Sequence, residues 1–372
     1  MTNVDMFLKL LRASLRGKRF NWQGRSWTHE QYMSVMAIAR QQAVAGLVAQ
    51  SLVDSGVKLD QNDALKLFQM VQRIRQNNTK LNEKVVDLCK QMNERNIRIY
   101  VFKGQTLATM YPDGGLRQSG DVDFGCYPED WDECLGIFKN EMVLDITDDT
   151  TEKHVSFNIS GVEYELHRQL TAFSYPRHRK YWAKAVMPEI LNTLSSVNIN
   201  GYEVPTLHPT YNALYVFVHI FYHLLDEGVG LRQFCDWAVL LMQDMENSSQ
   251  CIDVELLERH LRGLGLKKAY TGLGAILTDF LGLPEEIFPL PISAKDHKRA
   301  KALLNNMLEM GNFGHNKRYK KNSGAVHGLQ HIGRITMQAR RFYVYAPSEA
   351  LWRVPYMFNW WASKLVSKFK KK

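Results

Sequence analysis

The chain has 372 residues, of which 45% are hydrophobic and 23% charged, and its formal net charge is +9. This allows a buried core of two or three structural units, and the positive balance suits a polyanionic partner such as a nucleotide, nucleic acid or anionic lipid. The five cysteines form no CxxC pair, which argues against a disulfide framework or structural zinc and favours reduced thiols in the cytoplasm.

The N-terminal segment has an early aspartate and no long apolar core, so we expect no signal peptide. Residues 3–96 show helical periodicity, and we expect three or four helices there, one of them capped by Thr28. At residues 97–101 apolar side chains alternate with Arg98 and Tyr100, which indicates a strand.

Short helices and strands follow, up to about Tyr181. We expect, in chain order, a short helix at 105–111, a strand at 121–127, a helix at 128–140 and a hairpin formed by strands 154–159 and 162–168.

From residue 209 the pattern is helical again. The longest apolar run, 213–225, contains two histidines and is too short to cross a membrane, so we expect a buried helix. Residues 293–331 are polar, basic and irregular, and the tail from residue 351 is aromatic and then basic.

The strand at 121–127 begins with Asp-Val-Asp. Side chains two residues apart on a strand point to the same face, so Asp121 and Asp123 share one face. Their carboxylates repel each other unless a cation lies between them, and Mg²⁺ binds such pairs while keeping phosphate oxygens as further ligands. An isolated Asp-x-Asp is more often a solvated strand face, so the surrounding residues decide between the two interpretations.

A third carboxylate is available in the strand at 162–168. Glu163, Glu165 and His167 share one face of that strand. If it lies beside the strand at 121–127, one of the two glutamates can complete a three-carboxylate site. Two Mg²⁺ ions held there would stabilise the attacking and leaving oxygens of an in-line displacement at phosphorus.

Positive charge and a glycine lie nearby. Lys103 and Gly104 stand between a strand and a short helix, where a glycine lets the backbone approach a phosphate and a helix start offers unpaired N–H groups. Lys103 and Arg117 add positive charge to the same region.

The order of these motifs, FKG, GLRQSGDVDF and VEYELH, resembles the DNA polymerase beta-like nucleotidyltransferase superfamily. More closely, it is similar to a group of uncharacterised bacterial nucleotidyltransferases with an apolar-Lys-Gly, an Arg shortly before Asp-x-Asp and a later Glu-Leu-His. The resemblance covers residues 99–168 and, more loosely, the helices at 209–283.

The resemblance implies an α+β fold, with a mixed-sheet nucleotidyltransferase core flanked by N-terminal and C-terminal helical regions. We therefore expect four parts: an N-terminal helical region at 1–95, the core at 96–185, a helical region packing on the core at 186–290, and a basic, helical tail region at 291–372.

The resemblance also implies transfer of a nucleoside monophosphate from a nucleoside triphosphate to an acceptor hydroxyl, with release of pyrophosphate. Gly104 stands at the first glycine of the superfamily signature, and Asp121 and Asp123 stand at its metal-binding pair. Glu165 is the expected third acid, with Glu163 as the alternative. Mg²⁺ is the expected metal, with Mn²⁺ as its alternative.

Five residues are expected to bind nucleotide or phosphate: Lys103, Gly104, Arg117, Ser119 and Arg232. In similar enzymes, including toxin-type members, a basic residue on a helix after the core faces the phosphates, and Arg232 holds that position. The alternative is that Arg232 and Asp236, four residues apart, form an ordinary ion pair on a helix surface. Gln105 departs from the signature, which prefers a second small residue there.

Four histidines are weaker candidates. His219 and His223 have the spacing of a zinc pair, but no third ligand is evident, so we expect core histidines. His154 and His167 are candidates to orient a carboxylate or the acceptor hydroxyl. The sequence has no GxSxG, Walker A or GxGxxG motif, so serine-hydrolase, P-loop and Rossmann chemistry lack support.

Several partners remain open. The acceptor is a small molecule, sugar, protein or RNA hydroxyl, and the basic stretch at 317–321 either binds a polyanion or forms a loop. The tail, with Trp352, Tyr356 and Phe358, either packs on its own domain or lies on an anionic membrane surface. The alternatives to this enzyme are a catalytically silent nucleotide- or anion-binding scaffold of the same fold and a toxin-type or RNA-modifying nucleotidyltransferase.

Overall fold

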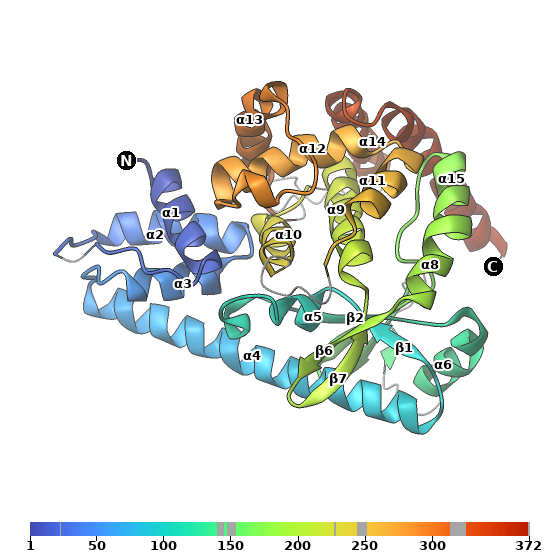
Figure 1. The fold of residues 1–372 in the computed structure, drawn as a ribbon, viewed down its shortest axis with the longest axis horizontal. Coiled ribbons are helices and arrows are strands. Elements are labelled where there is room, and N and C mark those ends of the chain that lie inside the picture. Colours follow the sequence, from blue (N-terminus) through green and yellow to red (C-terminus); the bar gives the residue numbers. More distant parts are fainter. Residues whose placement is uncertain are drawn as a thin grey trace.

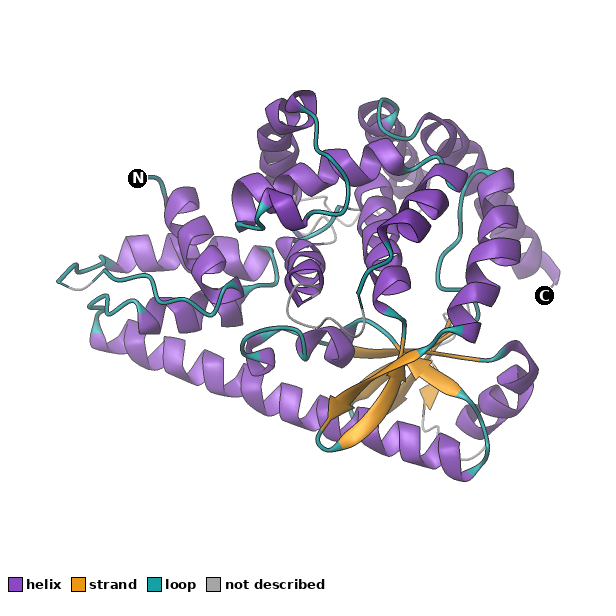
Figure 2. Ribbon diagram, viewed as in Figure 1, coloured by secondary structure: helices purple, strands orange, loops and turns teal. Residues whose placement is uncertain are grey.

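The strands of the chain gather in one place, between a long helix below and a group of helices above (Figure 1). A computed structural model describes residues 1–22, 24–139, 145–146, 154–226, 228–243, 251–312 and 325–370, without the side chains of 145–146, 325–331 and 360–370. A further group of helices lies beside the strands, at the N-terminus (Figure 2). The fold is α+β with helical flanks, as the sequence predicts.

Four helices form the N-terminal region, in agreement with the predicted three or four. They are α1 (Asn3–Leu15), α2 (His29–Gln41), α3 (Ala45–Asp54) and α4 (Gln61–Glu94). Thr28 caps α2 as predicted: its hydroxyl accepts a hydrogen bond from the Gln31 backbone, and the Gln31 side chain accepts one from the Thr28 backbone. Helix α4 extends past the other three and runs beneath the strands (Figure 1).

The main sheet has five strands in the order β1-β2-β5-β4-β3. They are β1 (Ile99–Val101), β2 (Asp121–Cys126), β3 (Asp145–Ile146), β4 (His154–Ile159) and β5 (Val162–His167). β2 and β5 are parallel, and every other neighbouring pair is antiparallel. The predicted strands and the predicted hairpin are confirmed, whereas β3 has no counterpart in the prediction.

The two faces of this sheet differ because side chains alternate along each strand. Val122 and Phe124 of β2 and Leu166 of β5 point to one face, where they share an apolar core with α4 residues such as Leu88. The carboxylates of β2 and β5 therefore lie on the opposite face.

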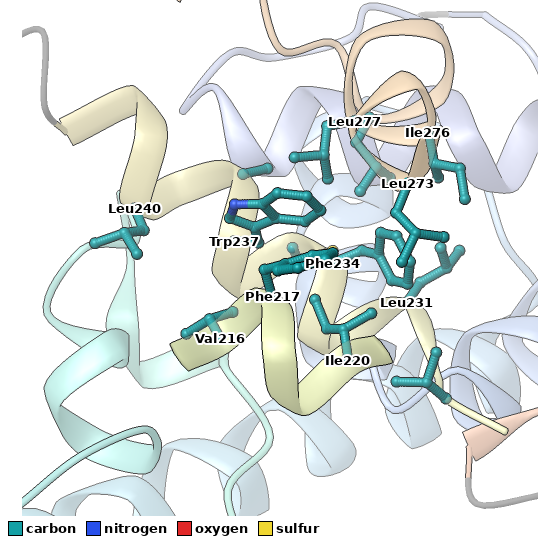
Figure 3. Close-up of a cluster of buried hydrophobic side chains, with 14 of the residues drawn as sticks. Val216, Phe217, Ile220, Leu231, Phe234, Trp237, Leu240, Leu273, Ile276 and Leu277 are labelled. Atoms are coloured by element: carbon teal, nitrogen blue, oxygen red, sulfur yellow. The ribbon is translucent and has the colours of Figure 1, made fainter. Parts of the chain in front are cut away.

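The helices above the polar face pack in a second apolar cluster, which also includes buried residues of α1, α2 and α3. Phe217 of α9 (Pro209–Asp226), Trp237 of α10 (Leu231–Gln243) and Leu273 point toward one another (Figure 3). The Phe217 and Trp237 ring centroids are 5.5 Å apart. This packing holds α9 and α10 together above the sheet.

The prediction that residues 293–331 are irregular is wrong for most of that segment, which contains helices. Helix α13 runs from Ala294 to Met310 and begins with a capping box between Ser293 and Asp296. Helix α14 begins at Ala325. The apolar face of α13 is buried, but its many charged residues obscure that periodicity in the sequence.

A second, two-stranded sheet also has no predicted counterpart: β6 (Ser195–Ile199) pairs with β7 (Tyr202–Thr206). The other helices are α5 (Gly104–Ala108), α6 (Trp131–Ile137), α7 (Pro176–Tyr181), α8 (Met187–Asn192), α11 (Val254–Gly263), α12 (Lys267–Ile276), α14 (Ala325–Phe342) and α15 (Pro347–Lys370). The division of the chain into four parts stays a prediction.

Two buried charged residues tie α15 to α9. Glu349 is completely buried, and its carboxylate accepts a hydrogen bond from the Tyr222 hydroxyl and lies 2.7 Å from Nδ1 of His178. Arg353 forms an ion pair with Asp226 at the end of α9. The C-terminal helix is thus held by specific polar contacts as well as by packing.

The predicted aromatic tail is only partly described. Trp352 lies against Tyr175, with ring centroids 5.8 Å apart, and Arg179 lies over the ring of Tyr356. Phe358 is 64% exposed. The remaining aromatic and basic side chains of the tail, and the stretch at 317–321, lie outside the described residues, so membrane or polyanion binding there stays a prediction.

No helix in the described ranges is both long and apolar enough to cross a membrane. None of the cysteines forms a disulfide.

We expect Glu349→Ala to destabilise the protein by about 3 kcal/mol, because it leaves several buried hydrogen-bonding groups without a partner. Urea unfolding followed by tryptophan fluorescence measures this. Glu83→Ala, on the exposed side of α4, is the matched control and should change stability by less than about 0.5 kcal/mol. Equal effects of the two substitutions would contradict a structural role for Glu349.

Candidate active site

The polar face of the main sheet, together with α9 and α10, encloses a cavity of about 330 Å³. This volume lies within the range of small-molecule sites. The titratable side chains that line it are Lys103, Arg117, Asp121, Asp123, His154, Glu165, His167, His219, Tyr215, Tyr222, His223, Asp226, Arg232 and Asp236.

Three of the predicted carboxylates converge on the floor of this cavity. In the parallel pairing of β2 with β5, Asp123 lies opposite Glu165 and Asp121 opposite Glu163. One oxygen from each of Asp121, Asp123 and Glu165 lies within 4.8 Å of the others. Glu163 is exposed and, among the described residues, belongs to neither this group nor the cavity lining. The structure thus brings Glu165, the expected third acid, and not its alternative Glu163, to Asp121 and Asp123; its role in metal binding stays a prediction.

Lys103 supplies a positive charge to this group, because its Nζ lies 3.2 Å from Oδ1 of Asp123. Burial alone would lower the pKa of Lys103, but the Asp123 carboxylate raises it above the usual range. Burial alone would raise the pKa of Asp123, but Lys103 and His167 lower it well below its usual value. The charge of Asp123, together with burial, raises the pKa of Asp121 to about 6. A cation among the carboxylates would relieve this repulsion.

Two histidines adjoin the carboxylates. Nε2 of His167 lies 2.8 Å from Oδ1 of Asp123 and 3.1 Å from Oε2 of Glu165. Nε2 of His154 lies 3.9 Å from the other oxygen, Oε1, of Glu165. This arrangement is compatible with the expected role of orienting a carboxylate.

The turn between β1 and α5 places Lys103 next to Asp123. Lys103 has φ 58° and Gly104 has φ 38°, both in the left-handed region, which is costly for a lysine. A Cβ on Gly104 would meet the Asp121 backbone oxygen at 3.5 Å, an ordinary contact. The glycine is therefore required by its backbone angle more than by lack of space. The phosphate cradle at this turn stays a prediction, because α5 has only five residues.

Gln105, the departure from the superfamily signature, does not line the cavity. Its side-chain Nε2 donates hydrogen bonds to Oδ1 of Asn82 and to the backbone oxygen of Asn78, both on α4. The larger side chain thus joins α5 to α4 and leaves the cavity free.

Arg117 is buried and forms two hydrogen bonds with Asp236 of α10, at 2.7 and 2.8 Å. The Tyr111 hydroxyl donates to the same carboxylate, and Arg117 Nη1 donates to the Ser119 hydroxyl. Ser119 is not among the residues that line the cavity. The guanidinium of Arg117 is therefore largely occupied by protein partners, and its predicted contact with phosphate stays a prediction.

Arg232 lines the cavity, but it does not form the ion pair with Asp236 that its helical spacing suggests as an alternative. Asp236 pairs with Arg117, while Nη1 of Arg232 donates to the backbone oxygen of Gln118 at 2.8 Å. Its Nε is buried and makes no hydrogen bond within the described residues. Arg232 thus retains donor capacity at the cavity wall.

Residues of α9 that the sequence analysis did not assign to the site also line the cavity. Tyr215, His219 and His223 recur every four residues, so they share one face of the helix. Burial lowers the pKa of His219 well below its usual value, which keeps the imidazole neutral. Among the described residues, neither His219 nor His223 belongs to a three-residue metal-binding group. The polar residues at this spacing, within an apolar helix, are the signal that could have located the cavity wall.

The donor atoms on the cavity floor fit a hard divalent cation. Mg²⁺ prefers carboxylate oxygens and phosphates, and the three carboxylates here carry more charge than Lys103 offsets.

A model of the family described as uncharacterised nucleotidyltransferases matches residues 29–282, which is more than half of the chain. The chain belongs to this family. The matched span includes the whole main sheet, the three carboxylates and helices α9 and α10, so the cavity lies inside the nucleotidyltransferase region. Assignment to the bacterial group suggested by the motifs stays a prediction.

One solved structure similar to this chain is that of an antigenic nucleotidyltransferase-like protein from Paracoccidioides brasiliensis. The two chains are 15% identical, with 56% of this chain and 96% of that chain covered, and a TM-score of 0.34. With so low a TM-score, this similarity does not extend to the details of the site. No curated protein matches the chain.

We expect Asp236→Ala to destabilise the protein by about 3–5 kcal/mol, because it leaves the buried charge of Arg117 uncompensated. The double variant Arg117→Ala/Asp236→Ala should recover part of this loss, since it removes both charges. Chemical unfolding of the two single variants and the double variant measures the coupling. Arg98→Ala, which breaks an exposed ion pair with Glu129, is the control and should have a much smaller effect. Additive losses in the double variant would contradict a structural pair.

Proposed function

We propose that this protein transfers a nucleoside monophosphate from a nucleoside triphosphate to an acceptor hydroxyl, with Mg²⁺, or alternatively Mn²⁺, held by Asp121, Asp123 and Glu165. The observation that carries the proposal is the convergence of these carboxylates, from neighbouring parallel strands, on the floor of a cavity. Membership of a nucleotidyltransferase family supports the class of reaction.

In the proposed reaction the acceptor oxygen forms a bond to the α-phosphorus as the bond from that phosphorus to the bridging oxygen of pyrophosphate breaks. Pyrophosphate leaves with the electron pair, and the hydroxyl proton is released. A bound divalent metal would offset the charge of the triphosphate and polarise the reacting phosphoryl group. Asp121, Asp123 and Glu165 would hold that metal, with Asp123 oriented by His167 and Lys103.

The basic residues of the cavity have different proposed roles. Arg232 would bind the triphosphate, because it has donor capacity left at the cavity wall. Lys103 and the turn at Gly104 would bind phosphate next to the metal. Arg117, which lines the cavity, would contact phosphate while Asp236 holds its guanidinium in place, and Ser119, which accepts a hydrogen bond from Arg117, would assist that contact. Cytoplasmic location remains part of the proposal and agrees with cysteines that form no disulfide.

We expect the purified chain to transfer label from an α-labelled nucleoside triphosphate in the presence of Mg²⁺, and EDTA to abolish the transfer. Asp121→Asn and Asp123→Asn should each lower the rate by at least about 100-fold, because each removes a metal-binding charge. Glu163→Gln, on the same sheet face but outside the carboxylate group, should leave it nearly unchanged.

The acceptor is found by offering total RNA, protein and small-molecule fractions separately. Label on RNA would identify an RNA-modifying enzyme, and label on the other fractions would identify a protein, sugar or small-molecule hydroxyl. Nucleotide binding without transfer to any fraction, unaffected by the Asp121→Asn and Asp123→Asn substitutions, would overturn the proposal in favour of a catalytically silent scaffold.

We expect Arg232→Gln to weaken nucleoside triphosphate binding by about tenfold or more, because a charge-assisted hydrogen bond contributes about 1.5–3 kcal/mol. Isothermal titration with a non-hydrolysable triphosphate in Mg²⁺ measures the affinity. Arg340→Gln, on the exposed side of α14, is the charge-matched control. Unchanged affinity in Arg232→Gln would show that the guanidinium does not contact the phosphates.

A further inference from the structure

Beside the three-carboxylate group, the cavity contains a second set of metal-binding side chains: His154, Glu165 and His167. His154 and His167 are directly opposed in the antiparallel pairing of β4 with β5, and Glu165 lies two residues before His167 on the same face. The positions of the three side chains are therefore fixed by one strand pair.

The atoms of this set are spaced for a metal ion. Nε2 of His167 lies 3.1 Å from Oε2 of Glu165, and Nε2 of His154 lies 3.9 Å from Oε1. All three donor atoms lie within 4.8 Å of one another. A tetrahedral ion with bonds of about 2.0–2.1 Å holds its ligand atoms about 3.3 Å apart. The two distances to Glu165 lie on either side of this spacing.

The donor chemistry of the set differs from that of the carboxylate group. Two imidazoles and one carboxylate suit zinc and related transition metals, whereas Mg²⁺ prefers oxygen ligands only. Three protein ligands leave a tetrahedral ion one open position. Because all three residues line the cavity, that position would be accessible to water or to a substrate.

The local charge permits one such ion. Asp121, Asp123 and Glu165 together carry three negative charges, and Lys103 offsets one of them. A single divalent cation would therefore neutralise the group, and a second would be favoured by the negative charge of a bound triphosphate.

We propose that His154, Glu165 and His167 form a second metal site, which binds Zn²⁺ or a similar transition-metal ion, with Glu165 shared between this site and the three-carboxylate group. Glu165 and His167 also belong to the proposed nucleotidyl-transfer site, but the metal binding proposed here is argued from the arrangement of the three ligands and not from that reaction. With both sites filled, Glu165 bridges two chemically different ions, and His167 exchanges its contact with Asp123 for a bond to metal.

Co²⁺ is the probe for this site, because its visible absorption reports four-coordinate binding to a site that suits Zn²⁺. We expect the metal-free wild type to bind one Co²⁺ with visible absorption in the presence of excess Mg²⁺, and Zn²⁺ to displace it. His154→Gln and His167→Gln should each lower the Co²⁺ affinity by at least about tenfold. Asp121→Asn should retain the absorption, and His208→Gln, which lies outside the cavity lining, is the matched control.

A measurement on the wild type does not require that the substituted proteins fold. Electron paramagnetic resonance of bound Cu²⁺ should show coupling to the nitrogens of two imidazoles. Absence of nitrogen coupling, or Co²⁺ binding that is lost in Asp121→Asn and kept in His154→Gln, would overturn the proposal and place the ion among the carboxylates alone. Failure of label transfer with these spectra intact would contradict only the proposed function.

Discussion

The parallel pairing of β2 with β5 sets the geometry on which the candidate site depends. It places Asp123 directly opposite Glu165, although 42 positions of sequence separate them. A shift of this register by one residue would turn one set of side chains to the other face. That shift would bury the carboxylates of the shifted strand in the apolar core on α4, which contains Val122 and Leu166. The cost of burying charge in that core therefore enforces the register.

Helix α4 supports this arrangement from below with polar as well as apolar contacts. Asn78 donates hydrogen bonds to the backbone oxygens of Gly115 and Arg117, at 2.9 and 2.7 Å. Its own backbone oxygen, with the side chain of Asn82, accepts hydrogen bonds from Gln105. The segment between β1 and β2 is thus held at both ends by one helix. This explains how a glutamine serves where a second small residue is usual.

The parts of the site that sequence predicts are those governed by local periodicity. Asp121 and Asp123 share a face because strand side chains alternate. The register sets both Glu163 and Glu165 opposite an aspartate, and only the positions of the side chains separate the two. The partner of Arg117 could not be predicted in this way, because Asp236 lies on α10, far along the chain from Arg117. Local spacing instead pairs Asp236 with Arg232, four residues away. Which of the two arginines pairs with Asp236 depends on tertiary packing, which brings Arg117 into a buried bidentate contact with it.

The cavity wall also depends on chain outside the family match, which ends at residue 282. Asp226 and Tyr222 line the cavity on α9, and both are held by α15: Asp226 by Arg353, and Tyr222 by Glu349. Removing either contact would leave a buried polar or charged group without its partner. The C-terminal helix is therefore part of what shapes the cavity wall. The carboxylate floor lies within the span that matches the family, whereas Tyr222 and Asp226 of the wall are held by a helix that follows that span.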